Sequence, residues 1–255
     1  MISNPAVLAG GALVLAFVLL LSLGKFTARW KSMAARFGAV PHCPLTPTEM
    51  VFFCVLTGWT FVYFAMWLPA LAVGAAMFLY LRHGISAAEY WSLAVRDIPA
   101  CLKTGVFVYF SLLIPLLLVS WSSFKICSWF GYKEGMQPAV EAFLEMKDPR
   151  QIAGFLFMAC VIAPVWEEVV FRGVFYPFLK NHLGAGWSML LSSFVWASVH
   201  QYPPVFAPLL LLGFALVFVY ETSGKLSYSI VLHAVFNTST CMALILYKYV
   251  TPTAV

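Results

Sequence analysis

Apolar residues form seven long runs along the chain, separated by short stretches that hold most of the charged side chains. The runs cover residues 5–24, 50–81, 105–121, 152–179, 187–201, 203–220 and 226–247. Since about 20 consecutive apolar residues form a helix that crosses a bilayer, this pattern predicts an all-α integral membrane protein. The segment 67–69, which contains Pro69, interrupts the run 50–81, so this run forms either one long kinked helix or a hairpin of two short helices. The positions of the basic residues favour the hairpin. We therefore expect a bundle of about eight transmembrane helices, with seven as the alternative.

Basic residues beside the apolar runs predict the orientation of the chain. The first run, 5–24, has no basic residue before it and is followed by a basic cluster between Lys25 and Arg36. This order is typical of a retained anchor with its N-terminus outside the cell, not of a cleaved signal peptide. The hairpin at 50–81 places the basic residues of 82–103 on the same side of the membrane as this cluster.

The chain is expected to form one integral domain with two parts. Residues 1–150 hold the N-terminal membrane helices, an interfacial helix and a polar loop, and residues 151–250 hold the membrane core with the polar motifs. Ser86 and Glu89 have the spacing of a capping box, which predicts the start of the short interfacial helix. The segment 133–150 is the most polar of the chain and is expected to be a solvated loop with one amphipathic turn.

Composition supports a multi-pass protein of the cell membrane. Hydrophobic residues make up 62% of the chain and charged residues 10%, against about 25% charged residues in a soluble domain. The net charge of +5 is spread beside the apolar runs, so we expect the lipid bilayer as a partner and no nucleic acid. The six cysteines lie mostly inside apolar runs without close pairs and are interpreted as packing residues.

Few ionisable groups lie inside the apolar runs of the C-terminal half, away from their ends. They are Glu167, Glu168, Arg172, His200 and His233, with Asn237 as a polar neighbour. Ionisable groups at membrane depth are costly, so each is a candidate functional residue. Any one of them has a structural explanation, but two pairs at helical spacing on runs otherwise free of charge favour a site.

Helical spacing separates the roles of the two adjacent glutamates. Glu168 and Arg172 are four residues apart, which predicts an ion pair on one helix face. Glu167 is rotated by about 100° from Glu168 and has no local partner, so it is the candidate base. Glu167 lies 16 residues before Leu183 and His200 lies 17 residues after it. A helical hairpin that turns near Leu183 would bring Glu167 and His200 to the same height.

These residues supply the parts that peptide hydrolysis needs. A base must activate water, a second group must hold that water, and donors must stabilise the oxyanion that forms on the scissile carbonyl. Glu167 is expected to act as the base and His200 to position the water. His233 and Asn237, four residues apart on the last helix, are expected to supply the donors.

Three motifs in order resemble the CAAX prenyl protease and bacteriocin-processing family of intramembrane proteases, also called the Abi family. That family has the patterns EExxxR, FxxxH and HxxxN. Here they occur at 167–172, at 196–200 with Trp196 in place of Phe, and at 233–237. The resemblance covers about residues 150–245. It implies an intramembrane endopeptidase in which Glu167 and His200 hold the water, His233 and Asn237 stabilise the oxyanion, and about eight spans enclose a water-accessible cavity.

Other functions remain open from the sequence alone. Glu167, His200 and His233 could bind zinc as in a metalloprotease, although no HExxH helix is present, and we expect no cofactor. A non-catalytic immunity or scaffold protein of the same fold is a second alternative. A proton-coupled transporter is a third, although no repeated halves with broken helices are seen. For a protease, the partner is a membrane-associated or lipid-anchored protein or peptide, and no residue specifies which one.

Overall fold

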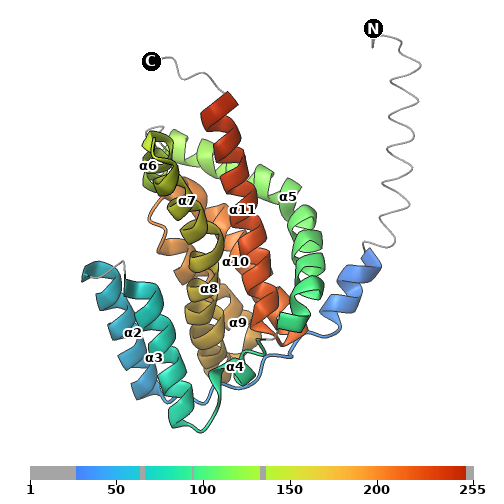
Figure 1. The fold of residues 1–255 in the computed structure, drawn as a ribbon. Helices are drawn as coiled ribbons and strands as arrows, with labels where there is room; N and C mark the ends of the chain where they lie inside the picture. Colours follow the sequence, from blue (N-terminus) through green and yellow to red (C-terminus); the bar gives the residue numbers. More distant parts are fainter. Residues whose placement is uncertain (1–26, 64–66, 94, 133–135, 251–255) are drawn as a thin grey trace.

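The structure, a computed structural model, describes residues 27–63, 67–93, 95–132 and 136–250 (Figure 1). Within these ranges all regular secondary structure is helical, as predicted. The expected anchor at 5–24 lies outside the described residues. The elements are α2 (Pro47–Tyr63), α3 (Leu68–Arg82), α4 (Ala87–Tyr90), η2 (Val95–Asp97), α5 (Ile98–Trp129), α6 (Pro138–Glu145), α7 (Pro149–Phe157), η3 (Met158–Ile162), α8 (Ala163–Glu168), η4 (Val169–Phe175), α9 (Tyr176–Ser198), α10 (Pro203–Ser223) and α11 (Leu226–Val250).

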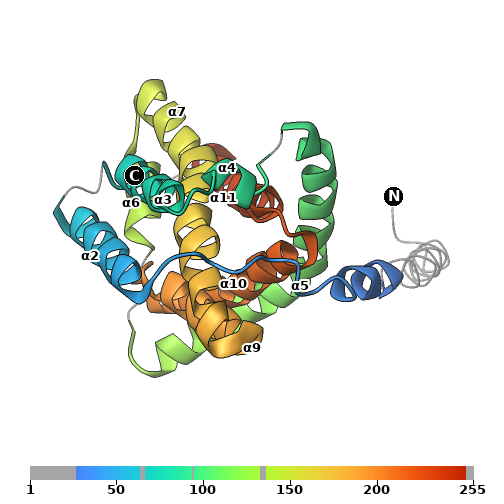
Figure 2. The same ribbon diagram turned by 90° about the horizontal axis from the view of Figure 1, so that it is seen from below.

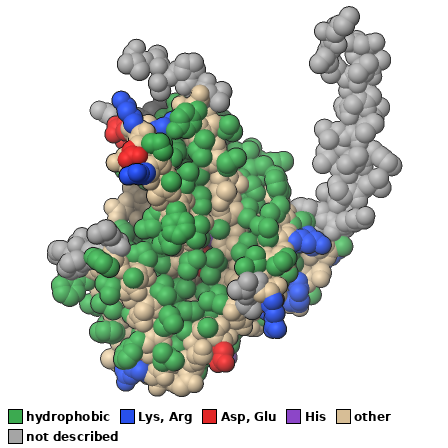
Figure 3. All heavy atoms as spheres, in the orientation of Figure 1, with side chains coloured by type: hydrophobic (Ala, Val, Ile, Leu, Met, Phe, Trp, Pro, Cys, Tyr) green, Lys and Arg blue, Asp and Glu red, His purple; other side chains and the backbone are tan. Residues whose placement is uncertain are grey.

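Four helices of the described ranges are long and apolar enough to cross a membrane: Ile98–Trp129, Pro149–Ser198, Pro203–Ser223 and Leu226–Tyr249. Figure 3 shows hydrophobic side chains over the middle of one face, with charged side chains near its edges. The chain is therefore a multi-pass membrane protein, as the composition predicted. The count of about eight crossings stays a prediction.

The helices α2 and α3 form the hairpin that the run 50–81 predicted. Glu49 at the start of α2 contacts both Arg82 and His83 at the end of α3, with an Nε2–Oε2 distance of 2.9 Å to His83. The hairpin lies beside the bundle in Figure 1, and α3 packs against α8 and η4. Ala72, Ala76 and Leu79 of α3 are buried.

The core of the bundle is α10, with α5, α9 and α11 packed around it (Figure 2). Over half of its apolar stretch is buried inside the protein, the largest share of the four candidate spans. Gly213 permits the close approach of α9, because a Cβ at this position would lie only 2.8 Å from Cβ of Ser193. The long helix α5 contains Pro115 and bends across the top of the bundle in Figure 1. Proline is a usual cause of such a bend.

The helix α9 reverses direction at Gly184, next to the predicted turn at Leu183. Gly184 has φ 73° and ψ 168°, values that residues with a side chain rarely adopt. Beyond it the chain runs back along η4 and α8, as the contact of Trp196 with Glu167 shows. The predicted helical hairpin is confirmed.

Two local predictions need correction. The helix at α4 begins after Ser86 as expected, but it has a single turn, and the Ser86 side chain forms no capping hydrogen bond. The expected loop at 133–150 contains the helix α6, whose Phe143 is fully buried against Phe155. The Lys248 ammonium of α11 donates to three carbonyl groups at the end of α6, which holds this helix against the bundle.

Candidate functional site

One continuous helix carries the EExxxR motif, and it departs twice from α geometry. It runs from Pro149 to the turn at Gly184, and the π-helical segments η3 and η4 lie on either side of α8. π-Turns leave backbone groups to be satisfied by other parts of the protein, and they are frequent at functional sites. Glu167 lies near the middle of this helix.

Side chains of other elements donate hydrogen bonds to carbonyl groups in these π-helical segments. Asn237 Nδ2 donates to the carbonyl of Ala159 in η3 over 2.7 Å. Tyr80 and Trp91 both donate to the carbonyl of Gly173 in η4, over 2.7 and 3.1 Å. A Cβ on Gly173 would lie 2.8 Å from Nε1 of Trp91, so glycine permits this contact. The site helix is thereby fixed from two sides.

Glu168 is completely buried and has a donor on each carboxylate oxygen. Its Oε1 accepts from Arg172, the predicted partner at i+4, over 2.9 Å. Its Oε2 accepts from Ser229 of α11 over 2.6 Å. Removing a partner from such a buried pair leaves an uncompensated charge, which is strongly destabilising. The expected ion pair is confirmed, and its position gives Glu168 no access to solvent.

His233 lies between the two glutamates. Its Nδ1 is 2.9 Å from Oε1 of Glu168, and its Nε2 is 4.0 Å from Oε2 of Glu167. Helical spacing separated the two carboxylates, and it did not indicate that each would lie beside one nitrogen of the same imidazole. An ionised carboxylate only accepts hydrogen bonds, so Nδ1 of His233 donates to Glu168.

Trp196 contacts Glu167, Arg172 and both histidines of the site. Its Nε1 donates to Oε2 of Glu167 over 2.8 Å, and Arg172 lies over its ring at 4.6 Å from the centroid. Its ring also packs edge-on against those of His200 and His233, at 5.1 and 5.3 Å. The tryptophan that replaces the family's phenylalanine thus adds a hydrogen-bond donor for Glu167.

His200 follows α9, which carries Trp196, and Asn237 lies on α11, which carries His233. The His200 ring lies at the end of α9, where Nδ1 donates to the carbonyl of Trp196 over 2.9 Å. Because a carbonyl only accepts, the neutral ring carries no proton on Nε2. Gln201 next to it has φ 52°, a left-handed conformation often found at functional sites. Asn237 uses one amide hydrogen on Ala159, and the other remains for a further acceptor.

The structure also contains a second buried acidic cluster, which the sequence analysis did not predict. We call it the anchor cluster: Tyr176, Lys180, Glu221 and the segment 39–43. Oε1 of the fully buried Glu221 accepts from the Tyr176 hydroxyl over 2.6 Å and lies 2.7 Å from Nζ of Lys180. Lys180 and Glu221 lie near the ends of their apolar runs, where charged residues are common. No pattern in the sequence therefore indicated that they form an ion pair.

The anchor cluster fixes the segment 39–43 onto the bundle. The Ala39 amide donates to the Glu221 carbonyl, and Lys180 donates to the carbonyl of Val40. Asn181 donates to the Cys43 carbonyl over 2.7 Å and accepts from the Cys43 amide. These are contacts to backbone, which is typical of a structural role.

The side chains of the site do not form a metal-binding set. Among the described residues, no group of three or more His, Cys, Asp and Glu side chains is arranged to hold a metal ion. Nδ1 of His233 and both oxygens of Glu168 are used in hydrogen bonds, which reduces the donors available to a metal. The zinc alternative therefore gains no support from the geometry.

Residues 149–239 match the model of the family described as "Type II CAAX prenyl endopeptidase Rce1-like". The matched segment contains all three motifs. The chain is also similar to the UPF0177 protein YaiF of Lactococcus lactis subsp. lactis (strain IL1403), with 35% identity over 79 residues, which cover 31% of this chain and 35% of that protein. The chain thus spans about a third of the length of this curated relative. No solved structure matches. The resemblance to CAAX prenyl proteases is confirmed for this segment.

Proposed function

We propose that the chain is an intramembrane endopeptidase that cleaves a peptide bond with a water molecule activated by Glu167. One observation carries the proposal: a buried imidazole lies between two carboxylates, of which one is fully satisfied and the other is open. The side chain of Glu168 is 0% exposed and that of Glu167 is 15% exposed. Among the described residues, Oε1 of Glu167 has no hydrogen-bond partner. The family match of residues 149–239 supports the same activity.

Glu167 acts as the base and His200 orients the water. The water donates one hydrogen to the Glu167 carboxylate and the other to Nε2 of His200, which is the acceptor when Nδ1 donates to Trp196. The water oxygen then attacks the scissile carbonyl carbon while Glu167 takes its proton. Glu167 later returns this proton to the leaving amine nitrogen, so that it is regenerated as a carboxylate. The mechanism needs a water-accessible cavity at Glu167, as the family resemblance implies.

The oxyanion is stabilised by His233 and Asn237. Because Nδ1–H of His233 donates to Glu168, Nε2 carries a hydrogen only when the ring is an imidazolium. Its Nε2–H and the second amide hydrogen of Asn237 are then available to the oxyanion. Preorganised donors of this kind are worth about 10²- to 10³-fold in turnover each.

The substrate is a membrane-associated or lipid-anchored protein or peptide. A pocket of about 380 Å³ adjoins the end of α9 and is lined by Ala197, Ser198, Gln201, Tyr202, Pro203 and Phe206. These residues flank His200 on both sides in the sequence. This pocket is suited to a substrate side chain next to the scissile bond. The reaction written above requires no cofactor.

Comparative proteomics of membrane and released fractions tests the proposal. Cells that produce the wild-type protein should release peptides that are absent with Glu167→Gln. Glu145→Gln is the matched control, because Glu145 is exposed on α6 and outside the site. Equal release by wild type and Glu167→Gln, at equal levels of inserted protein, would contradict the proposal. Activity that is lost to a chelator and restored by zinc would favour the zinc alternative.

A further inference from the structure

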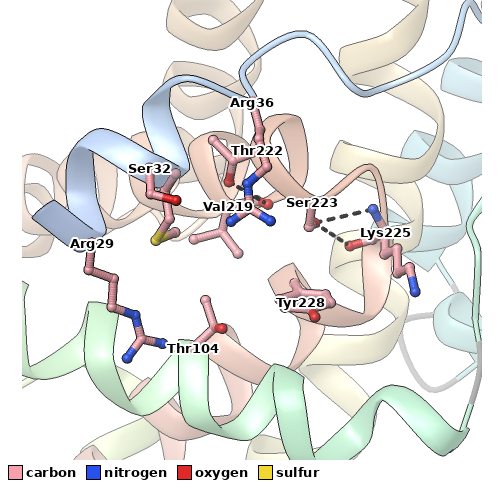
Figure 4. Close-up of a pocket in the computed structure, with 10 residues that line it drawn as sticks. Arg29, Ser32, Arg36, Thr104, Val219, Thr222, Ser223, Lys225 and Tyr228 are labelled. Atoms are coloured by element: carbon pink, nitrogen blue, oxygen red, sulfur yellow. Dashed lines mark hydrogen bonds between the residues drawn. The ribbon is translucent and has the colours of Figure 1, made fainter.

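A polar pocket lies at the end of the bundle where α10 ends and α11 begins (Figure 4). It has a volume of about 430 Å³ and opens between the helical residues 27–34, the first turns of α5 and the α10–α11 turn. The lining residues are Arg29, Ser32, Met33, Arg36, Thr104, Val219, Thr222, Ser223, Lys225 and Tyr228. None of them belongs to the proposed catalytic set, so the pocket is a separate site.

Two of the three cations in this lining keep their positive charge uncompensated. Lys225 lies 2.6 Å from the carboxylate of Asp97, which neutralises it. Arg29 donates to the carbonyl of Lys103 and lies over the ring of Phe107, neither of which carries a negative charge. Among the described residues, neither Arg29 nor Arg36 forms an ion pair with a carboxylate. The pocket is therefore electropositive and attracts an anion.

Hydroxyl groups around the pocket suit an oxygen-rich anion. Ser32, Thr104 and Tyr228 each carry a hydroxyl in its lining, whereas the Thr222 hydroxyl donates to the Val219 carbonyl. Figure 4 shows Arg36 reaching inward from above and Thr104 and Tyr228 on the opposite side. Arginine with several hydroxyl donors is a common arrangement for phosphate oxygens.

The position of the pocket indicates a lipid as the source of the anion. Three candidate spans begin or end here, at Ile98, Ser223 and Leu226. Leu102 and Val106 of α5, which flank Thr104, are 50% and 36% exposed, and Phe37 beside Arg36 is 41% exposed. Acyl chains can lie on these apolar side chains while the headgroup enters the pocket. A soluble anion would gain nothing from this surface.

We propose that this pocket binds the phosphate headgroup of an anionic phospholipid from the adjacent leaflet. Basic pockets between membrane helices are suited to such headgroups. The glycerol hydroxyls of phosphatidylglycerol match the hydroxyl lining. The choline group of phosphatidylcholine is repelled by the two uncompensated arginines. The proposal is independent of the proteolytic function, because it concerns other residues at the end of the bundle.

Native mass spectrometry of the full chain in neutral detergent tests the proposal. Dioleoyl phosphatidylglycerol, dioleoyl phosphatidylcholine and inorganic phosphate are titrated separately. We expect phosphatidylglycerol to bind more tightly than the other two. Arg36→Gln should lower its affinity about fivefold, the usual effect of one cation near an anionic lipid. Lys31→Gln, which removes one charge from the same segment outside the lining, should leave the affinity unchanged.

Each contrary result overturns the proposal. If Arg36→Gln and Lys31→Gln lower the affinity for phosphatidylglycerol equally, the lipid is attracted by the overall surface charge and does not bind at a specific site. Inorganic phosphate that binds as tightly as the lipid would identify a soluble anion as the ligand. Thr104→Val provides a second test if Arg36→Gln does not fold, because it removes one hydroxyl at nearly constant volume. It should weaken phosphatidylglycerol binding about threefold, and unchanged binding would contradict the inference.

Discussion

Two buried acidic clusters, one around Glu168 of α8 and one around Glu221 of α10, differ in what surrounds the carboxylate. At the site, Glu168 is satisfied by Arg172, Ser229 and His233, while its neighbour Glu167 keeps partial exposure. In the anchor cluster, Glu221 has a cation and a tyrosine, and its Oε2 is buried without a partner among the described residues. Both clusters thus contain a buried carboxylate beside a cation.

Because a buried acid–cation pair occurs in both clusters, this pair alone does not support the proposed catalytic role. The anchor cluster has no imidazole beside its carboxylate, and Lys180 also donates to the backbone of the segment 39–43. At the site, the satisfied Glu168 orients a histidine toward the open Glu167. The combination of one closed carboxylate, one imidazole and one open carboxylate is what distinguishes the site.

Replacement of the open carboxylate should have the largest effect. Glu167→Gln removes the proposed base, so turnover should fall by about 10³-fold or more, at the upper end of the usual effect of general base catalysis. Thermal melting in detergent should change little, because Glu167 accepts one hydrogen bond and is partly exposed. A proteoliposome assay with a cleavable membrane-anchored peptide measures turnover. Retained turnover in Glu167→Gln would remove the functional distinction between the two clusters.

Replacement of the closed carboxylate should mainly reduce stability. Glu168→Gln leaves Arg172 buried without its charge partner, which should cost about 3 kcal/mol in the free energy of unfolding. Unfolding by SDS in mixed micelles measures this loss. The double variant Glu168→Gln/Arg172→Met should recover part of the stability, since no unpaired charge remains. Equal effects of Glu167→Gln and Glu168→Gln on stability and turnover would contradict the division of roles.

The anchor cluster should affect stability without affecting chemistry. Glu221→Gln leaves Lys180 without its carboxylate and should cost about 2 kcal/mol in the free energy of unfolding, within the range for the loss of a hydrogen bond to a charged group. Turnover per folded molecule should equal that of wild type, measured in the same assay at a temperature well below the melting point. A loss of turnover beyond the loss of folded protein would show that the two clusters are functionally coupled.

Trp196→Phe tests the donor that this chain adds to Glu167. The ring is kept, but the hydrogen bond from Nε1 to Oε2 of Glu167 is lost. We expect kcat per folded molecule to fall about tenfold, because one charged hydrogen bond no longer holds the base in place, while KM stays close to wild type. The melting temperature should also fall, because the smaller ring leaves a cavity at a fully buried position. Trp187→Phe, at an exposed position of the same helix, is the matched control. An unchanged kcat would assign Trp196 to packing alone.

The predicted part of the site depended on local spacing. Glu168 and Arg172 pair because residues four apart share a helix face, and the turn at Gly184 follows from a break between two apolar runs. The approach of His233 to both glutamates was harder to predict, because it depends on the tilt of α11 against α8. The anchor cluster joins residues 41 positions apart at the ends of their runs, and no spacing rule connects them.

Capping patterns were visible in the sequence but were assigned to the wrong helix. Ser86 and Glu89 have the expected spacing, yet the Ser86 side chain forms no capping bond. Thr46 and Glu49 have the same spacing, and each side chain accepts from the other residue's amide at the start of α2. Pro47 at the first helical position favours this second start, since its fixed φ suits a helix and its missing N–H is not needed there. Pro47 therefore distinguishes the capping box that forms, at Thr46 and Glu49, from the one that does not, at Ser86 and Glu89.

The π-segment η4 sets a rule for insertions and deletions in this chain. It lies between Glu168 and Tyr176. Because a π-turn contains one residue more than an α-turn, η4 determines in which direction Tyr176 and Lys180 point relative to Glu168. Loss of one residue between Arg172 and Tyr176 would turn everything that follows by about 100° and separate Tyr176 and Lys180 from Glu221, while Glu168 kept Arg172. Relatives that keep both clusters should therefore keep Arg172 and the length of the segment 169–175.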